Sequence, residues 1–156
     1  MNDFSQFKNH LRLSDFDLSW HDIPDRVGVY IIRAIRKSGT PIGLHRLNGV
    51  DAEGILLIGK SKSVRRRLHE FLMDIRQNDL EVGYHSEGWT FRACFRRNPN
   101  HGIIKLDDED LDASWEVTKG DRAADLLEAC LLQKYALKYQ DKPPLNLSLM
   151  REDWAV

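Results

Sequence analysis

One carboxylate in the C-terminal part of the chain stands where an apolar side chain is expected. The spacing predicts a long helix over residues 121–139, and at about 100° per residue its apolar side chains form one stripe. Glu128 falls inside that stripe, with Ala124 and Leu131. Because a lone carboxylate is costly to desolvate there, Glu128 needs a cation, a metal ion or water in a cleft. A structural ion pair, or a helix at the surface, is the simpler alternative.

Basic and hydroxyl side chains gather earlier in the chain, where a predicted strand meets a predicted helix. Lys60 and Ser61 follow an apolar run over residues 54–59, and backbone donors at such a junction favour an anion such as phosphate. Arg65 and Arg67 flank the apolar stripe of the following helix on opposite sides, and helical geometry alone does not choose between them. One carboxylate and several cations at one end of a small sheet suit a metal-assisted phosphoryl or phosphodiester reaction.

A literal nucleotide-binding motif is present in the same region. Residues 54–61 match G-x-x-x-x-G-K-S, the phosphate-binding P-loop signature. In a P-loop the four intervening residues form an open loop whose N–H groups surround the phosphates. Here those residues are Ile, Leu, Leu and Ile, which are typical of a buried strand. We therefore expect no nucleotide cofactor.

Apolar patterns predict the elements that position these residues. A β-branched run over residues 27–35 and the apolar run over 54–59 predict buried strands, joined by a long glycine-containing connection with short β structure. Apolar side chains at helical spacing predict a helix over 64–75. The remaining predictions are a partly helical segment around residues 3–13, a turn at 22–25, strands at 89–95 and 114–118, and the helix 121–139 with Asp121 as N-cap, ended by Pro143 and Pro144. The fold class is α+β, a small antiparallel sheet of three or four strands flanked by helices.

Length and composition limit the class of protein. A chain of 156 residues with 42% apolar residues predicts one domain with one core. No apolar run approaches the roughly 18 residues needed to cross a bilayer, and the first residues do not resemble a signal peptide. These features predict a cytoplasmic protein without membrane contact. Cys94 and Cys130 are expected to be reduced core residues.

Five motifs, in order along the chain, resemble those of the GIY-YIG nuclease domain. They are Gly28-Val29-Tyr30, the segment 57–62, Arg65-Arg66-Arg67-Leu68, the segment 124–128, and Pro144-Leu145-Asn146. The resemblance spans about residues 27–146. It implies a β-β-α-β-α fold and a metal-dependent DNA endonuclease that hydrolyses a phosphodiester bond.

The same resemblance implies a role for each matching side chain. Tyr30, aided by Lys60, would help to take the proton of the attacking water, and Arg67 would contact the phosphate. Glu128 would hold the single divalent metal ion, usually Mg²⁺, with Mn²⁺ as a possible substitute. Asn146 would support the site.

Further contacts and boundaries are implied around this centre. Substrate contacts are expected from Gly59, Ser61, Lys62, Arg65 and His69. DNA would be the partner, with a second copy of the chain or another protein as a possible addition. Residues 27–149 would form the nuclease domain, residues 1–26 an N-terminal extension that packs on it, and residues 150–156 a C-terminal tail.

Three departures from the family pattern define a second hypothesis. Leu57 replaces the tyrosine of the second motif and cannot donate, accept or ionise, and Phe71 stands where many members carry Tyr or His. The link between the first two motifs is long, which suggests a hairpin. Its side chains Lys37, His45 and Arg46 could touch DNA or belong to an exposed loop. The alternative function is a catalytically weakened domain that acts as a DNA-binding or protein-interaction module.

The nearly neutral total charge conceals an uneven distribution. The chain has a formal net charge of -1, yet residues 60–76 hold six basic and two acidic residues, a local net charge of +4. The acidic run over residues 107–116 is expected to be a solvated loop. The basic helix therefore lies at the predicted phosphate site, while the acidic remainder predicts weak general affinity for DNA.

Overall fold

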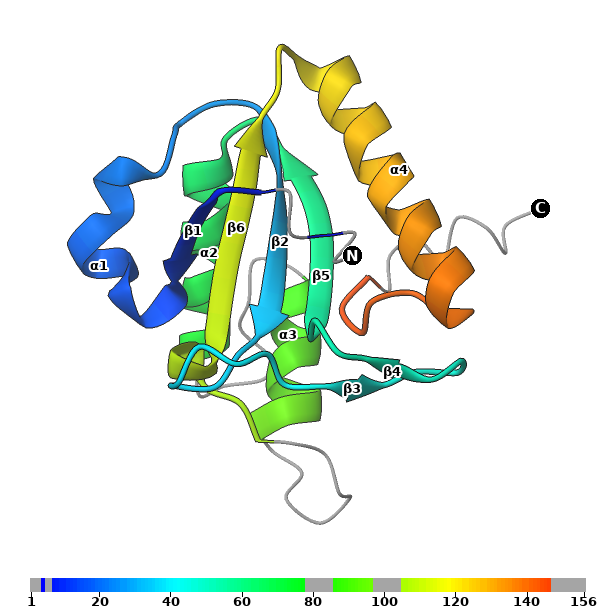
Figure 1. The fold of residues 1–156 in the computed structure, drawn as a ribbon. Helices are drawn as coiled ribbons and strands as arrows, with labels where there is room; N and C mark the ends of the chain where they lie inside the picture. Colours follow the sequence, from blue (N-terminus) through cyan, green and yellow to red (C-terminus); the bar gives the residue numbers. More distant parts are fainter. Residues whose placement is uncertain (1–3, 5–6, 78–85, 97–104, 147–156) are drawn as a thin grey trace.

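A four-stranded antiparallel sheet forms the centre of the protein. The computed structural model describes residue 4 and residues 7–77, 86–96 and 105–146. The strands are β1 (Asn9–Arg12), β2 (Gly28–Ala34), β5 (Ile55–Ser61) and β6 (Leu111–Val117), in the order β1-β6-β2-β5. Figure 1 shows β5 as the edge strand beside α4. The predicted α+β class is confirmed. Strand β5 continues through the lysine and serine of the P-loop match, so those residues form no phosphate-wrapping loop.

Helices cover the two faces of the sheet. On one face lies α2 (Val64–Arg76), with α3 (Ser86–Phe91) and a following π-helical segment, Arg92–Arg96. On the other face α4 (Asp121–Tyr139) packs against β2 and β5. Short helical turns complete the fold: Leu13–Asp15, α1 (Phe16–Ser19), Trp20–Asp22 and Asp108–Asp110.

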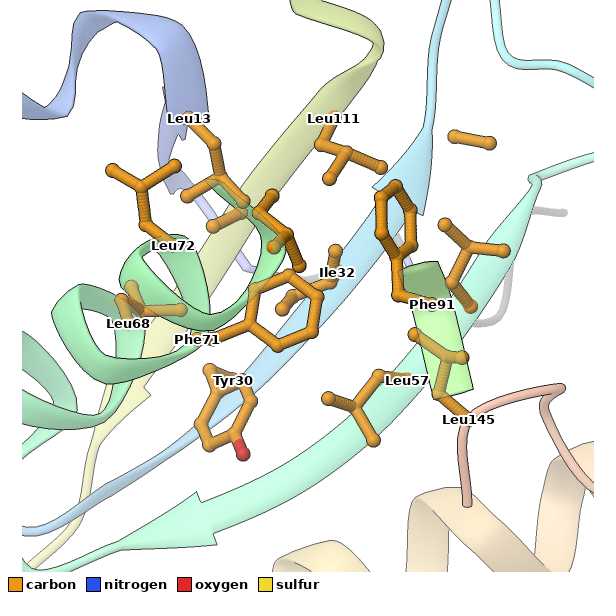
Figure 2. Close-up of a cluster of buried hydrophobic side chains, with 14 of the residues drawn as sticks. Leu13, Tyr30, Ile32, Leu57, Leu68, Phe71, Leu72, Phe91, Leu111 and Leu145 are labelled. Atoms are coloured by element: carbon orange, nitrogen blue, oxygen red, sulfur yellow. The ribbon is translucent and has the colours of Figure 1, made fainter. Parts of the chain in front are cut away.

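Two apolar cores result from the alternation of side chains along the strands. Tyr30, Ile32 and Leu57 face α2 and α3, as Figure 2 shows, whereas Val29 and Ile31 face α4. Leu57 is buried at 2% exposure. Its apolar side chain therefore completes the packing beneath α2 and α3, at the position where the sequence resemblance implies a tyrosine.

The long link between β2 and β5 contains a two-stranded hairpin, as the sequence predicted. Its strands are β3 (Leu44–His45) and β4 (Val50–Asp51). Arg46 does not point outward from it: the guanidinium is paired with Asp141 at 2.7 Å and donates to the carbonyl of Lys142. Arg46 therefore connects the hairpin to the segment that follows α4. Lys37 and His45 are both exposed, and Lys37 is paired with Glu109.

Two predicted elements are wrong in kind. In the partly helical segment expected around residues 3–13, residues 9–12 instead form β1, an edge strand that depends on pairing with β6 rather than on its own pattern; residues 3, 5 and 6 lie outside the described residues. The strand expected over 89–95 is helical, because Phe91 and Phe95 lie four residues apart on one face and both enter the core.

Smaller predictions also need correction. Gly120, rather than Asp121, occupies the N-cap position of α4. The acidic run is only partly a loop, since Asp112 and Glu116 belong to β6. Cys130 is exposed and Cys94 is partly buried, and both are free thiols.

The described part of the chain contains no helix with both the length and the apolar character required to traverse a lipid bilayer.

Candidate active site

Tyr30 lies opposite Gly59 on the neighbouring strand. The two residues are register partners in the β2–β5 pair, and Tyr30 is almost completely buried. A Cβ atom added at Gly59 would lie 2.5 Å from Tyr30 Oη, which is too close for any side chain. Glycine at this position therefore allows the phenol to lie across β5, and Figure 2 shows its hydroxyl pointing away from the apolar cluster.

Arg67 reaches the Tyr30 hydroxyl from the first turns of α2. The helix begins after Ser63, whose hydroxyl accepts a hydrogen bond from the backbone N–H of Arg66. The Nε–H of Arg67 donates to Tyr30 Oη at 3.0 Å. Arg65 lies on the other flank of α2, where it donates to the carbonyl of Ile23 at 2.7 Å. The structure therefore brings Arg67, and not Arg65, to the tyrosine.

Glu87, which sequence reasoning did not select, completes this group. Its carboxylate Oε2 lies 3.1 Å from Arg67 Nη2, and the two side chains are 15% and 14% exposed. Helix α3 brings it there because Gly88 packs directly against Asp74 of α2, without room for a Cβ. No pattern signal marks Glu87, since its segment was expected to lead into a strand.

Burial keeps Tyr30 in its neutral form. Desolvation raises the pKa of the Tyr30 hydroxyl above its ordinary value, against the opposing effect of the Arg67 guanidinium. Because Arg67 donates to the oxygen, the hydroxyl hydrogen is directed elsewhere. Tyr30 is thus arranged as a hydrogen-bond donor at neutral pH.

Lys60 and Glu128 form a second group, on the α4 side of β5. Lys60 Nζ lies 3.6 Å from Glu128 Oε2 and forms a closer ion pair with Asp125. Glu128 is 19% exposed, and burial raises the pKa of its carboxyl although the Lys60 ammonium opposes this effect. Lys60 directly follows Gly59, the register partner of Tyr30, so both groups border the same stretch of the edge strand β5.

Asn146 supports that edge rather than the reacting groups. Its Oδ1 accepts from the backbone N–H of Ile58 at 3.0 Å, and its Nδ2 donates to the Ile58 carbonyl at 2.7 Å. The N–H of Leu145 donates to the carbonyl of Leu56 at 2.9 Å. Asn146 therefore pairs like an additional strand residue and holds β5 next to Gly59.

The remaining predicted substrate contacts are divided between two places. Ser61 and Lys62 line a cavity of about 440 Å³ together with Lys60 and Asp125. His69 lies elsewhere, exposed and stacked on Phe16 with ring centroids 5.5 Å apart. With Arg65, it lines a separate cavity of about 570 Å³. The structure does not bring His69 or Arg65 to Tyr30.

The donor set at the β5 edge fits a hydrated divalent cation. Mg²⁺ is commonly bound by one or two carboxylates, with waters and substrate phosphate oxygens as its other ligands. Glu128 supplies a half-buried carboxylate, and burial raises the pKa of this group. One cation, the Lys60 ammonium, already lies beside it. Within the described ranges, no cluster of three or more His, Cys, Asp or Glu side chains could enclose a metal ion. Glu128 could therefore hold a cation whose other ligands would be water molecules and substrate oxygens.

Comparison with known proteins gives one structural likeness. Neither the protein-family models nor the curated proteins match the chain. Among solved structures, the chain is similar to the GIY-YIG N-terminal endonuclease domain of UvrC from Thermotoga maritima, in a point mutant bound to its catalytic divalent cation. The two are 19% identical, the match covers 85% of this chain and 96% of that chain, and the TM-score is 0.41. At this level the likeness assigns neither activity nor site residues to this chain.

Proposed function

We propose that the protein is a divalent-metal-dependent DNA endonuclease that hydrolyses phosphodiester bonds at the β5 edge. The observation that carries this proposal is the Arg67–Tyr30 hydrogen bond across Gly59 of β5, next to Lys60 and its partner Glu128. An arginine that faces solvent only in part, a neutral phenol and a half-buried carboxylate are complementary to an anionic diester and its counter-ion.

Each side chain would perform one task in this reaction. The guanidinium of Arg67 would bind the non-bridging oxygens of the phosphate and offset the charge that develops as water attacks phosphorus. The neutral Tyr30 would donate its hydrogen bond to a phosphate oxygen or orient the attacking water. This donor role replaces the proton-accepting role that the family resemblance implies, since burial raises the pKa of Tyr30.

Glu128 would hold the divalent cation, with Mg²⁺ or Mn²⁺ as the candidates. When bound, such an ion supplies a Lewis acid for the phosphate and the leaving oxygen. Lys60 is paired with both Glu128 and Asp125 in the structure. It would be available to the DNA backbone, with Ser61 and Lys62 beside it, when a cation takes over that role.

The second candidate is a DNA-binding or protein-interaction module with weakened catalysis. The burial of Leu57 in the core favours it, because this position supplies no polar group to the site. A second copy of the chain or a protein partner would then contribute what the domain lacks.

Affinity and cleavage measured side by side distinguish the two candidates. Branched, flapped, single-stranded and duplex DNAs would be incubated with the full chain and Mg²⁺ or Mn²⁺, and bound and cut fractions determined for each. Metal-dependent cutting of at least one substrate is expected. Tight binding of a substrate without cutting under any of these conditions would contradict the nuclease proposal and support the module.

A further inference from the structure

The guanidinium of Arg67 is fixed at two of its three nitrogens. Nε donates to Tyr30 Oη at 3.0 Å, and Nη2 is paired with Glu87 Oε2 at 3.1 Å. Among the described residues, Nη1 has no hydrogen-bond partner. Because the guanidinium is planar, two fixed nitrogens determine where the third points. The Glu87 contact therefore sets the direction in which Arg67 can bind a phosphate.

Glu87 is held firmly enough to act as such an anchor. The carboxylate is 15% exposed, so little solvent competes for it, and it comes from the helix that packs on α2 through Gly88. Phe91, from the same helix, is buried against Phe71 of α2 with ring centroids 6.1 Å apart. The contacts of Gly88 and Phe91, which follow Glu87 on the same helix, thus fix the carboxylate relative to Arg67.

The stability of the fold gives little reason for this pair. Desolvating two charges costs about as much as their attraction returns, and well-packed apolar side chains often serve a fold better than a buried ion pair. The charge of Glu87 also raises the pKa of Tyr30, which strengthens the neutral form of the phenol. The contact of Glu87 with Arg67 and its effect on the pKa of Tyr30 therefore both concern the candidate site.

We propose that Glu87 is a positioning residue of the nuclease site: it holds the guanidinium of Arg67 against Tyr30 and leaves Nη1 directed at the substrate phosphate. Glu87 acts through Arg67 and touches neither substrate nor metal. The inference rests on the proposed phosphodiester chemistry and deepens it.

The kinetic test compares Glu87→Ala and Glu87→Gln with a matched control. Asp141→Ala removes the carboxylate from another partly buried arginine pair, Arg46–Asp141, just after the end of α4. Glu87→Ala is expected to lower kcat by about 10- to 100-fold through misplacement of Arg67, with little change in KM. Glu87→Gln, which keeps an acceptor oxygen, should recover part of the loss, and Asp141→Ala should leave kcat unchanged.

Coupling to Arg67 separates positioning from a structural role. In an Arg67→Ala background, Glu87→Ala should cause no further loss, because the group through which it acts is gone. Losses that multiply, or a loss in Asp141→Ala equal to that in Glu87→Ala, would overturn the proposal. Should Glu87→Ala fail to fold, the same comparison is made with Glu87→Gln.

A spectroscopic measurement keeps this inference separate from the proposed function. In ¹⁵N-labelled protein, the Arg67 Nε–H signal should be slowly exchanging in the wild type and should shift and exchange faster in Glu87→Ala. An unchanged signal would overturn the positioning role whether or not DNA is cut. If the signal changes as expected and the wild type cuts no DNA, the anchor stands and the nuclease proposal fails.

Discussion

Burial gives Tyr30 a chemical character unlike that of an exposed tyrosine. Burial raises its pKa and keeps it neutral although Arg67 opposes this effect, and the hydrogen bond from Arg67 leaves the hydroxyl hydrogen of Tyr30 to be donated elsewhere. Tyr30→Phe keeps the ring in the core and removes only the hydroxyl, so the fold should lose about 1 kcal/mol. Cleavage should fall by about 100-fold, the usual effect of removing one donor to a developing charge.

Single-turnover cleavage and thermal unfolding of Tyr30→Phe check these two expectations separately. A variant that cuts at the wild-type rate would exclude the hydroxyl from the reaction. A rate in the wild type that climbs tenfold per pH unit toward pH 9, and is flat in the variant, would instead identify a tyrosinate base.

Gly59 should not tolerate even the smallest side chain. Gly59→Ala places a methyl group 2.5 Å from Tyr30 Oη, and the resulting displacement should cost about 1–3 kcal/mol of stability together with most of the activity. Gly120→Ala is the steric control, because a Cβ there meets no atom within 4 Å, and the change should cost only the weaker N-cap preference of alanine, about 1 kcal/mol or less. Chemical denaturation of both variants measures the difference; equal stability would show that the strands have room to separate.

The Glu128 carboxylate should lower the stability of the fold at neutral pH. Its pKa is raised by burial, so the folded state binds more protons than the unfolded state between the two pKa values. Stability therefore falls as pH rises through this interval, and the cost is fully present above the raised value.

Glu128→Gln removes that cost. At pH 7 the variant should unfold at the same temperature as the wild type or higher, and its advantage should shrink as pH falls below the usual range of a glutamate. Thermal unfolding from pH 3.5 to 7 follows this trend. A variant that is least stable relative to the wild type at pH 7 would mean that the Lys60 ion pair outweighs the burial.

At the scale of elements, periodic apolar patterns predicted the type and bounds of those helices and strands whose own side chains form a continuous buried face. Helix α2 buries Val64, Leu68 and Phe71 on one face, and β2 and β5 are apolar on both faces, so each was predicted near its observed bounds. Strand β1 and helix α3 were not, because β1 depends on its partner β6 and α3 on its close packing with α2.

The candidate site shows the same division. Glu128 stood out because a carboxylate interrupts an apolar stripe, and it is indeed half-buried. The choice between Arg65 and Arg67 needed the family resemblance, since both flank the stripe equally. Glu87 could not be predicted, because its position depends on how α3 packs on α2, a contact without a periodic signal.

The side chain of Asn146 pairs with the backbone of β5 at the free edge of this strand. Asn146→Ala leaves the N–H and carbonyl of Ile58 without their buried partners, which should cost about 2–4 kcal/mol in total. Hydrogen exchange at the Ile58 amide should accelerate, and cleavage should fall as Gly59 and Tyr30 lose their register. Unchanged exchange at Ile58 would show that other contacts hold the edge.

At the scale of the whole molecule, the net charge of -1 reflects opposed regions rather than a neutral surface. Part of the acidic run is structural: Asp107 and Asp110 cap each other's backbone, and Asp108 is paired with Arg76 at 3.1 Å. These carboxylates offset the basic helix at its far end from Arg67. General affinity for DNA should therefore be weak, and substrate shape or a second subunit should matter more.

The central claim is that the Arg67–Tyr30 group and Glu128 form one metal-dependent phosphodiester site. The most direct test is single-turnover cleavage of the preferred DNA, with and without Mg²⁺. It compares the wild type with Arg67→Ala, Glu128→Gln and a control, Arg76→Ala, which changes an arginine at the other end of α2. We predict that only the wild type and Arg76→Ala cut at the full rate, that Arg67→Ala and Glu128→Gln retain only a small residual rate, and that none of the four cuts without the metal. Cutting by Glu128→Gln at the wild-type rate, or by any of the proteins without a divalent ion, would contradict the claim.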